Sequence, residues 1–135
     1  MFLTFNCCSI NVNSLINKVN YIKDFIAVHN LHVVSVCETW LTAGVGSSLV
    51  EIEGYSFHRS DSPSEVRKHG VGVYVSRCLP AVPVEVGVDN VVALHLEVLG
   101  IYILTVYRPP SNSVEENGAL LSLVEEFVSA GRCCL

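Results

Sequence analysis

Two polar side chains follow apolar segments of this sequence, at positions where they could do chemistry. Glu38 comes directly after the apolar run Val33–Cys37. Its carboxylate could ligate a hard cation such as Mg²⁺, which often takes one or two carboxylates and keeps water and phosphate as its other ligands. Asn6 follows the apolar segment 1–5, and its amide could orient a phosphate or a carboxylate. From the residues alone, each could equally be an ordinary polar residue at a strand end or loop start.

Further side chains could contact a phosphate group. The phenol of Tyr107 stands at the end of an apolar segment and could donate a hydrogen bond to a phosphate oxygen. Arg59 and Arg108 could each hold phosphate through two parallel hydrogen bonds. The alternatives are a core or rim position for the tyrosine and a solvated surface position for each arginine. These residues become a site only if the fold brings them together.

Several common site patterns are missing from the sequence. The histidines at 29, 32, 58, 69 and 95 show no H-E-x-x-H spacing, and neither a P-loop nor a G-x-S-x-G elbow occurs. The six cysteines include two adjacent pairs and no C-x-x-C, so we expect free thiols rather than a zinc site. Gly70 and Gly72 precede a β-type segment, not a helix, which predicts close strand packing.

The first candidate residues require a strand, a helix and a second strand. Alternating apolar residues predict a strand over 1–5 that ends near Asn6, and Val33–Cys37 predicts another. Between them, an apolar stripe at spacings of four, three and four predicts a helix over 14–30 with Ser14 as its N-cap. Such a crossover makes the two strands parallel. We therefore expect Asn6 and Glu38 at one sheet edge, where open α/β sheets bind ligands.

The rest of the chain predicts sequential strands followed by a helix. Strands are expected over 55–59, 70–75, 82–86, 91–98 and 101–107, mostly antiparallel, with turns at Asp89-Asn90 and Gly100. Ser113 and Glu116 form a capping box for a helix that ends near 131. Residues 133–135 resemble the start of another strand, so we expect the fold to be truncated at its C-terminus or the chain to be a fragmentary gene product.

Composition predicts one globular α/β domain over residues 1–135. Half of the residues are hydrophobic and the formal net charge is -5, so no broad basic surface is available for nucleic acid. The most apolar stretch, 91–107, is interrupted by polar residues and too short to span a bilayer. The sequence starts without a basic leader, and the default expectation is an intracellular protein without membrane partners.

The order of the motifs resembles a known family. The most specific segment is Cys37-Glu38-Thr39-Trp40-Leu41, supported by Asn6 upstream and by Tyr107-Arg108-Pro109-Pro110 downstream. Together with segments 54–59 and 69–75, they resemble the N-terminal half of an endonuclease/exonuclease/phosphatase domain. The resemblance is strongest to the apurinic-endonuclease-like domain of non-LTR (LINE-type) retrotransposons and runs over essentially the whole chain.

The resemblance implies a fold, an activity and roles for the candidate residues. The fold would be a four-layer α/β sandwich, of which this chain forms part. The activity would be phosphodiester hydrolysis dependent on Mg²⁺ or Mn²⁺, with DNA as the target and a reverse-transcriptase domain downstream. Asn6 would be the active-site asparagine, Glu38 the metal ligand and Tyr107 the phosphate-contacting tyrosine. In an active retroelement the site of action would be the nucleus.

Departures from the family pattern limit the expected activity. The Gly-Asp-Phe-Asn and Ser-Asp-His motifs, which supply the water-orienting and base residues of the family, do not occur in these 135 residues. Pro110 replaces an asparagine found in some members, with Asn112 as the nearest substitute for substrate contact. We therefore expect negligible turnover by this chain alone. The alternatives are a phosphatase-like member acting on inositol lipids or sphingomyelin, and a non-enzymatic remnant that binds a partner.

Overall fold

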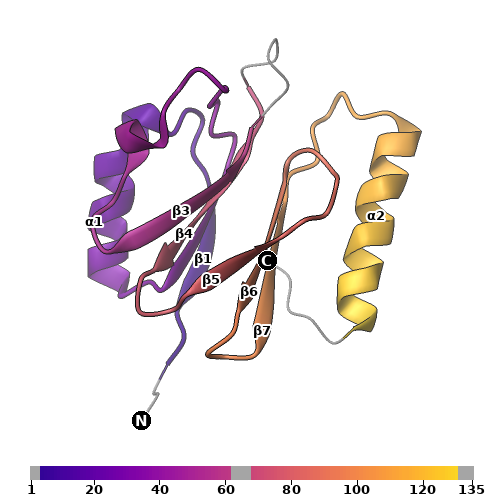
Figure 1. The fold of residues 1–135 in the computed structure, drawn as a ribbon. Coiled ribbons are helices and arrows are strands. Elements are labelled where there is room, and N and C mark those ends of the chain that lie inside the picture. Colours follow the sequence, from indigo (N-terminus) through magenta and orange to yellow (C-terminus); the bar gives the residue numbers. More distant parts are fainter. Residues whose placement is uncertain (1–3, 62–67, 131–135) are drawn as a thin grey trace.

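The computed structural model describes residues 4–61 and 68–130. Two β-sheets pack face to face, and one helix covers the outer face of each sheet (Figure 1). The layers are helix α1 (Val19–His29), a four-stranded sheet, a three-stranded sheet and helix α2 (Val114–Ser129). The expected α/β sandwich is thus confirmed, with all four layers represented in the described residues.

The four-stranded sheet contains the strand that directly precedes Glu38. Its order is β1 (Cys7–Asn11), β2 (Val33–Cys37), β4 (Val71–Ser76) and β3 (Tyr55–Ser60). β1 and β2 are parallel, with Asn11 opposite Cys37, and β4 is antiparallel to both of its neighbours. β2 is apolar except for Ser35, as expected for a strand with both faces covered, one by α1 and one by the second sheet.

The position of the first strand differs from the sequence-based prediction. β1 begins at Cys7, so Asn6 precedes the strand instead of ending it. The carbonyl oxygen of Asn6 accepts a hydrogen bond from the His32 backbone N–H at 2.7 Å, and its side-chain amide donates to the Asn30 carbonyl oxygen at 3.1 Å. Asn6 therefore lies at the amino ends of β1 and β2. Residues 1–3 lie outside the described residues.

The three-stranded sheet is an antiparallel meander that ends just before Tyr107. It contains β5 (Ala81–Val84), β6 (Val91–Leu96) and β7 (Ile101–Val106) in that order. In the register of β6 and β7, Val91 pairs with Val106 and Leu96 with Ile101. The expected strands, turns and antiparallel direction are confirmed, although β5 and β6 end two residues earlier than predicted.

The two helices agree with the apolar periodicity but differ in how they begin. The helix α1 starts at Val19, after a 3₁₀ turn over Ile16–Lys18, so its N-cap is Lys18 and not Ser14. At α2 the capping box of Ser113 and Glu116 is present, as predicted. Among the described residues, no helix has the length and apolar character to cross a bilayer.

One polar contact is buried between the two sheets. The hydroxyls of Ser35 in β2 and Thr105 in β7 lie 2.7 Å apart, and both residues are at most 1% exposed. The surrounding side chains are apolar and include Val33, Val73 and Leu94. Because apolar contacts are not directional, this hydrogen bond helps to fix how β2 lies against β7.

Gly72 allows the close packing expected for its segment. A Cβ built there would lie 2.5 Å from two ring carbons of Phe57, whose ring packs at 4.5 Å from the ring of Tyr74. We predict that Gly72→Ala lowers the free energy of unfolding by about 1–3 kcal/mol in urea titrations, because the ring must shift in a packed layer. Phe57→Leu in the same chain should recover part of this loss.

Gly118 provides the matched control for that substitution. It lies on the exposed surface of α2, and a Cβ there would meet nothing within 4 Å. Gly118→Ala should raise the free energy of unfolding by about 0.5–1 kcal/mol, since alanine is the better helix former. Equal effects of the two alanine substitutions would contradict the packing argument.

Candidate functional site

The structure brings Glu38 and Tyr107 into contact across the two sheets. Glu38 follows the last residue of β2, and Tyr107 follows the last residue of β7. The Tyr107 hydroxyl donates a hydrogen bond of 2.9 Å to Oε1 of Glu38. Both residues are half-buried. This contact leaves the second carboxylate oxygen of Glu38 available to another partner.

Glu38 is held in a left-handed backbone conformation by its neighbours. Its φ is 57°, and such a conformation costs a residue with a Cβ about 1–2 kcal/mol. The Glu38 carbonyl oxygen accepts from the Ser14 N–H, while the Thr39 N–H donates to the Gly70 carbonyl oxygen, at 3.0 and 3.2 Å. Backbone strain of this kind persists where surrounding bonds over-determine it, often at functional sites. The position of the carboxylate is therefore set by two flanking segments.

Asn11, not Asn6, is the asparagine at the same sheet edge as Glu38. Asn11 ends β1 opposite Cys37, the residue before Glu38. Cys7 packs in the layer between the sheets, so alternation places the Asn11 side chain on that same face. Asn6 is roughly 16 Å away along the strand, at about 3.3 Å per residue. The expectation that Asn6 and Glu38 share an edge is therefore wrong.

A signal for Asn11 was present in the sequence. Cys8, Ile10 and Val12 alternate with polar residues, and the structure packs all three in the layer beneath α1. The equally regular alternation over 1–5 competed with this signal. A period of two identifies a strand but does not say which of two adjacent segments pairs with β2.

His69 lies at the rim of the site and was not predicted there. Its ring centroid is 5.8 Å from that of Tyr107, with the planes tilted by 50°. The His69 carbonyl oxygen also accepts a hydrogen bond of 2.9 Å from the Trp40 N–H. The sequence offered no spacing signal for this histidine, because its neighbours in space come from β2 and β7.

Burial and the carboxylate control ionisation in the site. The pKa of Tyr107 is raised above its ordinary value, chiefly by burial. The hydrogen bond from the phenol to Glu38 and the negative charge of Glu38 raise it further. Burial, and to a lesser degree Glu38, also raises the pKa of the Cys37 thiol. At neutral pH the phenol is therefore a hydrogen-bond donor, and Cys37 is a protonated thiol rather than a nucleophile.

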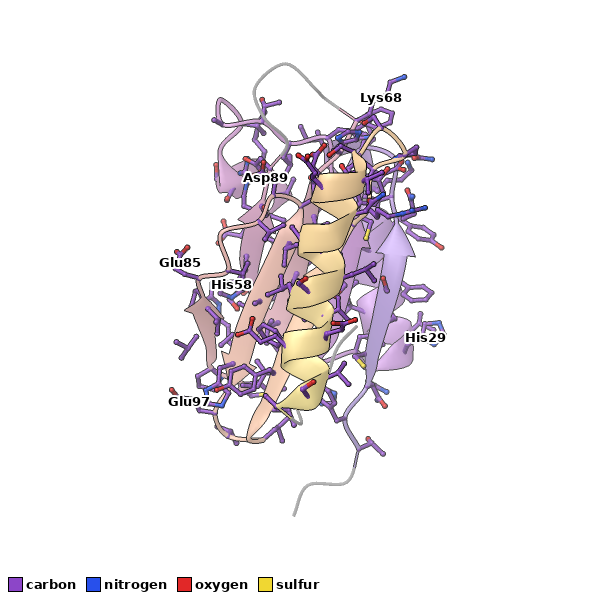
Figure 2. The ribbon with its side chains drawn as sticks, turned by 90° about the vertical axis from the view of Figure 1, so that its right-hand side faces the viewer. His29, His58, Lys68, Glu85, Asp89 and Glu97 are labelled. Atoms are coloured by element: carbon purple, nitrogen blue, oxygen red, sulfur yellow. The ribbon has the colours of Figure 1, made fainter. Side chains whose placement is uncertain are left out.

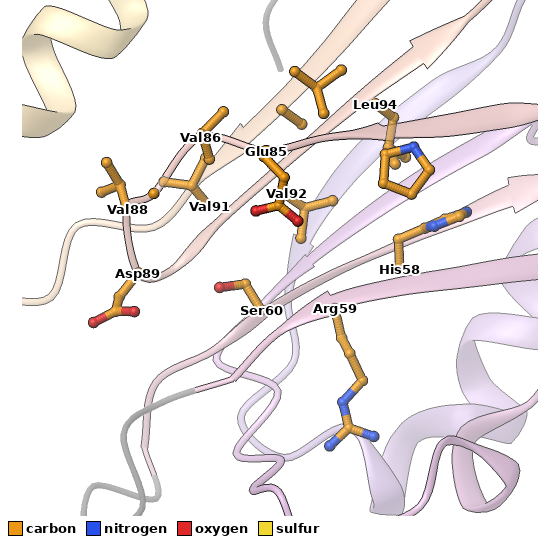
Figure 3. Close-up of a pocket in the computed structure, with 14 residues that line it drawn as sticks. His58, Arg59, Ser60, Glu85, Val86, Val88, Asp89, Val91, Val92 and Leu94 are labelled. Carbon is orange, nitrogen blue, oxygen red and sulfur yellow. The ribbon is translucent and has the colours of Figure 1, made fainter.

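Arg59 is engaged in a structural clamp. Its guanidinium donates to both carboxylate oxygens of Asp61 at 2.9 and 2.8 Å and to the backbone carbonyl oxygens of Thr42 and Val45. Arg59 is among the residues that line a pocket of about 530 Å³ with His58 and Glu85, although its guanidinium end extends away from Glu85 in Figure 3. These bonds fasten the loop after Leu41 to β3 and occupy the guanidinium, so the structure does not support Arg59 as a substrate-binding residue.

Arg108 and Asn112 lie in the segment that follows Tyr107. Arg108 is exposed beside Tyr107 in sequence. The backbone N–H of Asn112 closes a turn on the Pro109 carbonyl oxygen at 3.1 Å, and the residue is half-buried. Their contact with substrate stays a prediction.

The oxygen atoms of the site fit a hard divalent cation. A Glu38 carboxylate oxygen and the amide oxygen of Asn11 come from neighbouring strand ends, and the Asn11 oxygen accepts a hydrogen bond of 3.3 Å from the Asn13 N–H. The described ranges 4–61 and 68–130 contain no cluster of three or more His, Cys, Asp or Glu residues arranged for a metal. This donor set suits Mg²⁺ or Mn²⁺, which retain water and phosphate ligands, better than zinc.

Comparisons with known proteins identify the fold. No family model and no curated protein matches the sequence. The solved structures that match include an AP endonuclease from Archaeoglobus fulgidus (TM-score 0.67, 15% identity) and the 3'-5' exonuclease NExo from Neisseria meningitidis (TM-score 0.69, 17% identity). The chain has the AP-endonuclease fold. The two matches extend over 93% and 91% of this chain, respectively.

The same AP-endonuclease fold occurs in a retroelement protein. The endonuclease domain of TRAS1, a telomere-specific non-LTR retrotransposon, matches with a TM-score of 0.62 and 12% identity over 93% of this chain. The chain spans about half the length of these structures, namely 50%, 52% and 54% of each. The resemblance stated from sequence motifs is confirmed at the level of the fold.

The contact between Tyr107 and Glu38 predicts how the phenol titrates. Glu38→Gln should lower the pKa of Tyr107 towards its ordinary value without reaching it, because burial is the larger cause. The ¹³Cζ shift of Tyr107, assigned by its loss in Tyr107→Phe, measures this titration. Exposed Glu51→Gln is the control and should leave the shift unchanged.

The raised pKa of Tyr107 also predicts how the free energy of unfolding changes with pH. Because the pKa of Tyr107 is raised in the folded state, its contribution to stability is complete below the unfolded-state pKa and is lost as pH rises through the folded-state pKa. Tyr107→Phe should therefore flatten the alkaline decline of the free energy of unfolding. An unchanged Tyr107 titration in Glu38→Gln would contradict the hydrogen bond.

Proposed function

We propose that this chain forms the metal-holding part of a phosphodiesterase site that cuts DNA. The observation that carries the proposal is the hydrogen bond of 2.9 Å between Tyr107 and Glu38, at adjoining strand ends of a fold shared with nucleases. Asn11 adds an amide at the same edge. The function needs an anionic oxygen, a neutral donor and a polar amide around one phosphate, and these residues supply them.

The residues have separable roles in this proposal. Glu38 would hold Mg²⁺ or Mn²⁺ through its carboxylate, and Asn11 would orient the phosphate or a water. Tyr107 stays protonated at neutral pH and can donate a hydrogen bond to a phosphate oxygen when substrate displaces its bond to Glu38. The cation, when bound, supplies positive charge to the scissile phosphate and the leaving oxygen.

DNA is the proposed partner. The Neisseria NExo structure contains a product DNA hairpin, and a zebrafish TDP2 structure contains a single-stranded DNA product. The net charge of -5 leaves little long-range attraction to phosphates, so contact must be local to the strand ends around Glu38. The TRAS1 match supports a retroelement origin. A reverse-transcriptase domain downstream and action in the nucleus belong to this proposal on the strength of the motif resemblance alone.

In the family that this chain resembles, two sequence motifs supply the groups that activate water. These 135 residues contain no Gly-Asp-Phe-Asn and no Ser-Asp-His motif. Groups that act as a unit lose activity non-additively when some are absent. We therefore predict no Mg²⁺-dependent nicking of supercoiled plasmid by this chain above the level of its Glu38→Ala variant. Robust nicking that Glu38→Ala abolishes would contradict this part of the proposal.

Metal binding tests the proposal independently of turnover. Mn²⁺ should broaden the amide NMR signals of residues 11–13, 38–40 and 107, and Glu38→Gln should remove this broadening. Glu97→Gln is the matched control, because Glu97 lies in the β6–β7 turn, at the opposite end of the molecule from Lys68 and Asp89 (Figure 2). Broadening centred on the glutamates of α2, or unchanged in Glu38→Gln, would overturn the assignment.

A further inference from the structure

Asn90 is a buried asparagine in the turn that leads into β6. It is 6% exposed, although turn asparagines usually face solvent. Its φ is 58°, a left-handed conformation that asparagine tolerates better than most residues. The sequence pattern explained Asn90 as a turn residue. A turn requires only this backbone conformation and gives no reason to bury the side-chain amide.

The side chain and the main chain of Asn90 reach opposite sides of the candidate site. Its Oδ1 accepts a hydrogen bond of 3.0 Å from the Gly70 N–H, which precedes β4 in the four-stranded sheet. Its carbonyl oxygen accepts one of 3.0 Å from the Tyr107 N–H, which follows β7 in the three-stranded sheet. One residue therefore joins the ends of the two sheets.

The chain of bonds continues from Gly70 to Glu38. The Gly70 carbonyl oxygen accepts a hydrogen bond of 3.2 Å from the Thr39 N–H, in the peptide unit that follows Glu38. The path from Glu38 to Tyr107 thus runs through the backbone of Gly70 and through two oxygen atoms of Asn90, Oδ1 and the carbonyl oxygen. It closes a ring with the direct bond between the Tyr107 hydroxyl and the Glu38 carboxylate.

We propose that Asn90 is a positioning residue that sets the separation of Glu38 and Tyr107 by bonding the two sheets together at the site edge. Its consequence for catalysis rests on the function proposed above, whereas its effect on geometry does not. Apolar packing opposes sliding of the two layers only through the shapes of the side chains, because its contacts are not directional. Directional bonds to a buried amide resist this sliding, and small misplacements in a site are costly for activity.

Two substitutions separate the turn from the amide. Asn90→Gly keeps the left-handed turn and removes Oδ1, which leaves the Gly70 N–H without its acceptor. Asn90→Asp keeps an acceptor at the same place and also tolerates the turn. Asp89→Gly is the matched control, because Asp89 is the exposed neighbour in the same turn.

Three measurements on the 135-residue chain test the proposal. In Asn90→Gly, we expect the Gly70 amide to lose protection from hydrogen exchange and the titration of Tyr107 to move towards that seen in Glu38→Gln. The apparent Mn²⁺ dissociation constant, followed by relaxation of water protons, should rise about 10-fold, as for loss of a group that orients a metal ligand. Asn90→Asp should restore most of each change, and Asp89→Gly should cause none.

The outcomes distinguish this proposal from the function on which it builds. Unchanged Gly70 exchange and Tyr107 titration in a folded Asn90→Gly variant would overturn the positioning role, whatever Mn²⁺ does. If the wild-type chain does not bind Mn²⁺ but both geometric readouts respond, the proposed function fails and the positioning role holds. If Asn90→Gly does not fold, Asn90→Asp decides, because loss of Gly70 protection in that variant would overturn the role.

Discussion

The hydrogen bond between the Tyr107 hydroxyl and the Glu38 carboxylate is possible only while the two sheets keep one relative position. The partners are 69 residues apart in sequence and belong to different sheets. Most of the layer between the sheets is apolar and sets their spacing but not their alignment. Alignment comes from polar contacts between the sheets, namely the buried bond of Ser35 with Thr105 near mid-strand and the bond from the Gly70 N–H to the Asn90 side chain at the site edge. The candidate site is therefore a property of the sandwich and not of either sheet.

The elements that carry Glu38 and Tyr107 were predictable because their signals are local. A run that is apolar except for Ser35 marks β2 as a strand buried on both faces, and Glu38 directly after it must lie at the carboxyl edge. The capping box of α2 and the apolar stripe of α1 are equally local, since they depend on spacings within a few turns of helix. Contacts between the ends of β2 and β7 depend on the packing of the two sheets, which no local pattern specifies.

The errors concern residues whose partners are distant or ambiguous. Asn6 directly precedes β1 and Asn11 is its last residue. Only the pairing of Cys7 with Val33 decides which of the two asparagines reaches the carboxyl edge. Arg59 has the chemistry of a phosphate ligand, but Asp61 and the carbonyl oxygens of a preceding loop use its donors. Asn90 was assigned correctly to a turn, and that local explanation concealed its bond to Gly70. In each case the residue type indicated the possible chemistry, but the sequence did not indicate which partner the residue contacts.

The parallel pair of β1 and β2 also constrains how the site can vary. A shift of one residue in β1 would turn Asn11 to the face covered by α1 and bring Ile10 into the layer between the sheets. The packing of Cys8 and Ile10 opposes that shift. It would move their side chains from the layer beneath α1 to the face of β1 on which Ser9 and Asn11 are exposed. The register that buries one face of β1 is thus the same register that presents an amide beside Glu38. Packing energy and site geometry are therefore coupled in this strand, so substitutions at Cys8 or Ile10 act on the site through the position of Asn11.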